Sequence, residues 1–152
     1  MRRARIRGEL LSRSTRRAIA RVFERLDYSR LASLYCDEGG AAFWRARRGP
    51  CERLGAAFAG VLRARLRRGG RSLYVGAGVA ELPALLMERL ELGREPEAFN
   101  LKREEAAVLN RACRSAGLPL RIRAEDAAAA AGRFDHLWIV SVLNDPERFP
   151  EL

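Results

Sequence analysis

The stretch that most constrains this chain is residues 73–83, where a short β-branched and aromatic run meets two glycines and then an apolar helical pattern. This order predicts a strand, a tight turn and a helix. Gly76 and Gly78 lack a Cβ atom, so they tolerate positive φ and let a ligand approach the backbone. The first N–H groups of the helix would point at that ligand, and Pro83 fits only in its first turn. An ordinary strand-to-helix turn without a ligand is the alternative.

Strand-like and helical segments alternate after residue 70. Strands are expected at about 71–75, 96–100, 118–123 and 136–142, and helices at about 80–90, 102–116 and 126–131. The last strand is apolar nearly throughout, which favours burial on both of its faces. The alternation therefore predicts an α/β fold with right-handed crossovers and a doubly wound parallel sheet.

The first 70 residues are predicted to be helical. Apolar residues recur at helical spacing in segments at about 12–27, 29–36 and 51–67. Gly49-Pro50 is expected to end a short segment that precedes the third of these helices, and Gly69-Gly70 is expected to end the third helix itself. We therefore divide the chain into a basic helical cap, residues 1–70, and a cofactor-binding α/β region, residues 71–152.

The cap carries most of the positive charge. Residues 1–71 hold 19 arginines against 6 acidic residues, and the whole chain has a formal net charge of +10. These arginines are spread along helices at mixed spacing and are not gathered with aromatic residues. They are therefore predicted to form solvated helix faces, with a surface that binds RNA or another polyanion as the alternative.

Neither a membrane segment nor a metal site is predicted. No run approaches the roughly 18 to 20 apolar residues that cross a bilayer, and the arginine-rich start lacks the apolar core of a secretory signal. We therefore expect a cytoplasmic protein. The three cysteines have no metal-ligand spacing and His136 is the only histidine, so reduced cysteines are expected.

The quoted motifs, taken together, resemble the class I S-adenosylmethionine-dependent methyltransferases over residues 28–152. Residues 73–82 are similar to the family's first motif, 122–127 to its acidic loop after strand three, and 134–144 to its fourth strand. The resemblance implies a partial Rossmann-like sheet of four parallel strands in the order 3-2-1-4, and S-adenosyl-L-methionine as cofactor. It implies that the glycine turn holds the amino-acid part of the cofactor. The implied cofactor-binding residues are Tyr74, Gly76, Ala77, Gly78, Asn100, Leu101, Glu125, Asp126 and Ser141.

The methyl acceptor is not specified by these motifs. The resemblance makes Tyr28, Tyr35 and Trp44 in the cap, and Asn144 after strand four, candidates for substrate contact. The cap aromatic residues are, however, more typical of a hydrophobic core. No residue is assigned a catalytic role.

Two alternatives to a methyltransferase are open. The family usually has an acidic residue, a third glycine and an acidic ribose ligand where this chain has Tyr74, Ala80 and Asn100, which favours a cofactor-free interaction module with the same fold. A dinucleotide site is disfavoured, because its fingerprint requires glycine where this chain has Glu81.

The chain stops about ten residues after the fourth predicted strand, whereas a complete domain of the family has three further strands. The resemblance therefore implies a C-terminally incomplete domain. We expect either a fragment of a longer protein or a subunit whose fourth-strand edge is covered by another copy or a partner. Alone, the chain is expected to catalyse little or no methyl transfer.

Overall fold

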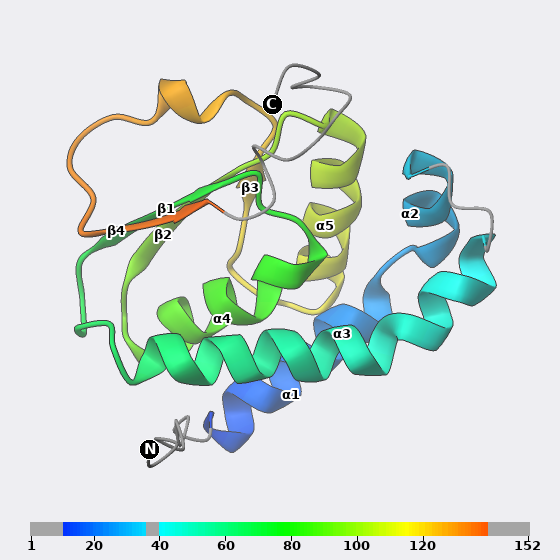
Figure 1. Cartoon of the computed structure of the whole chain (residues 1–152), viewed down its shortest axis with the longest axis horizontal. Coiled ribbons are helices and arrows are strands. Elements are labelled where there is room, and N and C mark those ends of the chain that lie inside the picture. The colour runs from blue at the N-terminus through cyan, green and yellow to red at the C-terminus, as the bar shows by residue number, and fades with distance from the viewer. Residues whose placement is uncertain (1–10, 36–39, 140–152) are drawn as a thin grey trace, which may run out of the picture.

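The computed structural model describes residues 11–35 and 40–139, and it contains one parallel sheet (Figure 1). The strands are β1 (Arg71–Val75), β2 (Glu95–Phe99), β3 (Ile122–Arg123) and β4 (His136–Ile139). They pair in the order β3-β2-β1-β4, and every pairing is parallel. The predicted α/β class and the strand order of a partial Rossmann-like sheet are confirmed.

Within the described residues, five helices and two 3₁₀ turns accompany the sheet. The helices are α1 (Arg13–Arg25), α2 (Tyr28–Leu34), α3 (Gly40–Arg63), α4 (Leu82–Glu91) and α5 (Arg103–Ser115). The 3₁₀ turns are η1 (Val79–Glu81) and η2 (Ala127–Ala129). The predicted helix at 126–131 is thus reduced to the single turn η2.

Local chemistry explains where these helices begin and end. The Ser12 hydroxyl accepts a hydrogen bond from the Thr15 backbone N–H at 3.1 Å, and the Asp27 carboxylate accepts one from the Arg30 N–H at 2.9 Å, so α1 and α2 each have an N-cap. Gly117 follows α5 with φ of +68°, a conformation that glycine adopts without the strain of a side chain.

The third helix contradicts the prediction for Gly49-Pro50. Instead of ending a segment there, α3 continues through both residues for a total of 24 residues. Pro50 removes one backbone donor, but its side chain is exposed and the helix packs on α2 and α4, so tertiary contacts outweigh the local preference. The ribbon of α3 bends along its length (Figure 1).

The helices lie on one face of the sheet, so the doubly wound arrangement is not found in the described residues. Ser72 and Tyr74 point into the core with α4, while the opposite face is crossed by the connection that contains η2 (Figure 1). The side chains of Leu137 and Ile139 on β4 are 57% and 45% exposed. The prediction that this strand is buried on both faces is therefore wrong for its described part.

The third strand is shorter than predicted. Pairing is restricted to Ile122 and Arg123, because Pro119 has no backbone donor and the chain is already bent between Leu118 and Leu120. On its outer edge the Asn110 side chain replaces a neighbouring strand, accepting from the Ile122 N–H at 2.7 Å and donating to its carbonyl at 2.8 Å.

The cap and the sheet share their hydrophobic core. α1 contacts α4 and α5, α3 contacts α4, and buried residues of α1 and α2 belong to the same cluster as Tyr74 and Leu85. The division of the chain into two domains at residue 70 thus stays a prediction from the sequence. No helix within 11–35 and 40–139 is long and apolar enough to cross a membrane.

Candidate functional site

The glycine turn joins β1 to α4 at the carboxyl end of the sheet. Gly76 has φ of +71°, which favours glycine. The Ala77 N–H donates to the Phe99 carbonyl at 2.9 Å, and the Gly78 N–H donates to the Glu81 carboxylate at 2.9 Å. The turn is therefore held by β2 on one side and by the first residues of the following helix on the other.

A small hollow of about 40 Å³ opens beside this turn. It is lined by Val75, Gly76, Phe99, Leu101, Glu125, Asp126 and Ala127. These residues come from the carboxyl ends of β1 and β2 and from the segment after β3, the place where ligands bind in open α/β sheets. This volume is well below the roughly 300–1,000 Å³ of small-molecule sites, so a bound cofactor would extend beyond the hollow.

The hollow brings together four of the residues expected at the cofactor: Gly76, Leu101, Glu125 and Asp126. One oxygen of Asp126 accepts from the Ala128 N–H at 2.9 Å, and Glu125 pairs with Arg123 at 2.7 Å. The walls are apolar and the rim is acidic. This combination suits a flat apolar group that carries hydrogen-bond donors.

Asn100 has a structural role that its predicted position at the ribose did not include. Its amide nitrogen donates to the Ala77 carbonyl and to Glu105, each at 3.0 Å, and its oxygen accepts from the Lys102 N–H at 2.8 Å. Both amide donors are therefore used inside the protein. In this arrangement Asn100 fixes the glycine turn to the first turn of α5.

Two buried carboxylates face each other across Gly78. Glu81 and Glu105 are only 8% and 3% exposed, and a Cβ atom on Gly78 would lie 3.6 Å from Glu81 Oε2 and 3.0 Å from Glu105 Oε1. Glu81 accepts from Gly78 N–H and Trp138 Nε1, and Glu105 accepts from Tyr35 and Asn100. Among the described residues, no ion pair to either carboxylate is found. Each carboxylate accepts two hydrogen bonds inside the protein, and a cationic group close to them would be attracted by their charges.

Gly78 is required for space rather than for backbone conformation. Its φ is −120°, which any residue adopts, but a Cβ atom there would lie only 3.0 Å from Glu105 Oε1. Ala77 lies between the two glycines with its methyl group fully buried in the core.

Tyr74 lies on the opposite side of the sheet from the hollow. Its hydroxyl donates to Glu88 at 2.5 Å, and its ring stacks on Trp138 with centroids 5.8 Å apart. Burial and the neighbouring Glu88 carboxylate raise the pKa of Tyr74 far above its ordinary value. The structure thus uses Tyr74 in the core, and its side chain does not reach the hollow.

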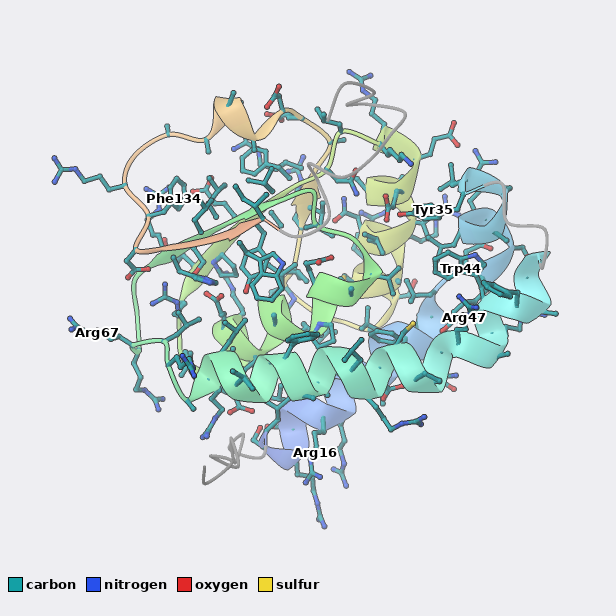
Figure 2. All side chains as sticks on the ribbon, viewed as in Figure 1. Arg16, Tyr35, Trp44, Arg47, Arg67 and Phe134 are labelled. Carbon is teal, nitrogen blue, oxygen red and sulfur yellow. The ribbon has the colours of Figure 1, made fainter. Side chains whose placement is uncertain are left out.

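The cap candidates separate into the buried Tyr28 and a stacked pair, of which Tyr35 is exposed and Trp44 is partly buried. Tyr28 is buried, its hydroxyl donates to the Phe23 carbonyl, and burial raises its pKa. Tyr35 is 42% exposed and its hydroxyl donates to Glu105. The Tyr35 and Trp44 ring centroids lie 5.4 Å apart, so these two residues reach the glycine turn through Glu105. Figure 2 shows both at the α2 end of the molecule.

Sequence reasoning missed Glu105, and it considered Glu81 only as the residue that disfavours a dinucleotide site. A signal for Glu105 exists: with Val108, Leu109 and Ala112 it occupies the apolar face of α5 at helical spacing. A carboxylate on such a face is either satisfied by neighbours or part of a site.

Two predicted residues, Ser141 and Asn144, lie outside the described residues. Within 11–35 and 40–139, no group of three or more His, Cys, Asp or Glu side chains is arranged to hold a metal ion.

Comparison of the chain with protein-family models, curated proteins and solved structures finds no match in any of the three. Assignment of a function therefore rests on the residues of the site.

Proposed function

We propose that this protein binds S-adenosyl-L-methionine at the carboxyl ends of β1 and β2 and is methyltransferase-like. The observation that carries the proposal is the pair of buried carboxylates around Gly78, next to a hollow with apolar walls and an acidic rim. The cofactor has matching chemistry, with an ammonium, a carboxylate and a sulfonium in its amino-acid part, which is net positive, and an adenine at the other end.

The chain's residues have distinct parts in this proposal. Glu81 and Glu105 stabilise the cationic end, while Val75, Phe99 and Leu101 contact the adenine ring. Glu125 and Asp126 accept hydrogen bonds at the rim. When bound, the cofactor supplies an electrophilic methyl group, and the protein accelerates transfer mainly by positioning it. Asn100 acts indirectly, because it holds the turn that carries both glycines.

The same carboxylates argue against a dinucleotide. A pyrophosphate beside Gly78 would approach Glu81 and Glu105, whose negative charges would repel it. A dinucleotide site needs the opposite, namely unpaired N–H groups and space at the third glycine position.

Calorimetric titration with S-adenosylmethionine and S-adenosylhomocysteine tests the proposal. Ala127 lines the hollow, whereas Ala129 is exposed in the same 3₁₀ turn and does not line it. Ala127→Trp is expected to fill the hollow and abolish measurable binding, and the matched variant Ala129→Trp should bind as the wild type does.

Failure of both compounds to bind a folded wild-type protein would support the cofactor-free interaction module instead. Equal binding by the two tryptophan variants would show that the cofactor sits elsewhere. Thermal denaturation adds an independent readout, because a ligand that binds only the native state raises the midpoint temperature of unfolding.

A further inference from the structure

Tertiary structure gathers aromatic and basic side chains that are scattered in the sequence. Lys102 Nζ lies 4.9 Å from the ring centroid of Tyr35, and the Arg47 guanidinium lies 3.6 Å above the ring of Phe43. Trp44 follows Phe43 directly in the chain and packs against Tyr35. We name this set, Tyr35, Phe43, Trp44, Arg47 and Lys102, the aromatic–basic cluster.

Several features of the cluster indicate a binding surface. Tyr35 is 42% exposed and Arg47 is exposed. No carboxylate in the described part of the chain forms an ion pair with Arg47 or Lys102, whereas Arg48 and Arg30 have such partners.

The cluster is connected to the proposed cofactor site. The Tyr35 hydroxyl donates to Glu105, one of the two carboxylates beside Gly78. A molecule that rests on Tyr35 would therefore lie next to the cationic end of the cofactor.

We infer that this cluster binds a single-stranded nucleic acid, with a base stacked on the exposed Tyr35 and with phosphates in contact with Arg47 and Lys102. An exposed aromatic ring beside cations is a feature by which proteins hold unpaired bases and their backbone. A duplex keeps its bases stacked inside and leaves the Tyr35 ring without a base. The idea that the bound strand is the methyl acceptor rests on the proposed function. Binding of the strand to the cluster does not depend on that function.

Fluorescence anisotropy with labelled oligouridylate and oligothymidylate, in the absence of cofactor, tests the inference. Tyr35→Ala should weaken binding by roughly fivefold or more, the loss expected for one base stack. Tyr35→Phe keeps the ring but loses the bond to Glu105, so it should bind as the wild type does. The two probes separate RNA from DNA as the preferred strand.

Charge is tested with two exposed arginines, one on α3 and one in the segment between α3 and β1. Figure 2 shows Arg47 in the cluster and Arg67 at the other end of the molecule, and both are exposed. Arg47→Gln should weaken binding and reduce the slope of log affinity against log salt by about 0.7, while Arg67→Gln should change neither.

Three results would overturn the inference: unchanged affinity in Tyr35→Ala, equal losses in the two arginine variants, or binding of a duplex as tight as that of the single strand. Competition with polyglutamate gives a further arm. If polyglutamate displaced oligouridylate at equal charge concentration, the surface would recognise acidic polymers in general. Calorimetry with S-adenosylmethionine is independent of these measurements, so failure of the cofactor proposal would be seen separately.

Discussion

At the scale of single residues, Arg94 is expected to contribute strongly to the stability of the fold. Its side chain is almost fully buried, donates to Glu88 at 2.9 Å and to the Gly69 carbonyl at 2.5 Å, and pairs with Asp135. The hydrogen bond from Arg94 holds the pKa of Asp135 below its ordinary range. Arg94 thereby ties α4 to the chain segments that enter β1 and β4.

Replacing Arg94 should be strongly destabilising. In Arg94→Leu, Glu88 would remain buried with its negative charge uncompensated, and we expect the free energy of unfolding to fall by about 3–5 kcal/mol in urea denaturation. Arg89→Leu is the control, since Arg89 is exposed on the same helix and should change stability by less than about 0.5 kcal/mol. A similar small effect of both substitutions would contradict the role assigned to Arg94.

At the scale of elements, α3 shows that packing maintains a helix that its sequence disfavours. Pro50 lies inside α3, and its ring removes a backbone hydrogen bond. Pro50→Ala should therefore raise the free energy of unfolding by roughly 1–3 kcal/mol, less than the full helix-interior cost because the packed shape of α3 accommodates the bend. The exposed Arg53 one turn later supplies the control Arg53→Ala. Loss of stability in Pro50→Ala would mean that the bend itself is needed for α3 to pack.

At the scale of the whole molecule, the cap and the sheet are expected to unfold together. α1 and α3 both pack on α4, and one hydrophobic cluster runs through cap and sheet. The chain has two tryptophans, Trp44 in the cap and Trp138 on β4. Each of the variants Trp138→Phe and Trp44→Phe leaves a single tryptophan as a fluorescent reporter. In each variant, the urea transition followed by tryptophan fluorescence should coincide with the one followed by circular dichroism. An earlier transition at Trp44 would show that the cap is a separate unit.

The open face and the β4 edge also belong to this scale. Leu137 and Ile139 are exposed on the face that lacks helices. The expectation that another copy or a partner covers this edge stays a prediction. So does the expectation of low methyl transfer by the chain alone.

The sequence by itself determined the class of fold, and the position of the site stays a prediction. Hydrophobic periodicity and glycine placement are local properties, so they were sufficient to predict β1, α4, β2, α5 and the turn at Gly76 and Gly78. The hollow contains Gly76, Leu101, Glu125 and Asp126 because the carboxyl ends of parallel strands meet at one edge.

Only the tertiary structure decided what depends on contacts between distant segments. In the structure α3 continues through Pro50, and the Tyr74 hydroxyl donates to Glu88, because packing and burial outweigh local preference. Leu137 and Ile139 are exposed. The tertiary structure also placed Glu105 opposite Glu81 across Gly78, and it brought Lys102 over Tyr35. These pairs are separated in the chain, and no spacing rule connects them, since their proximity arises from the way α5 packs against the glycine turn and the cap.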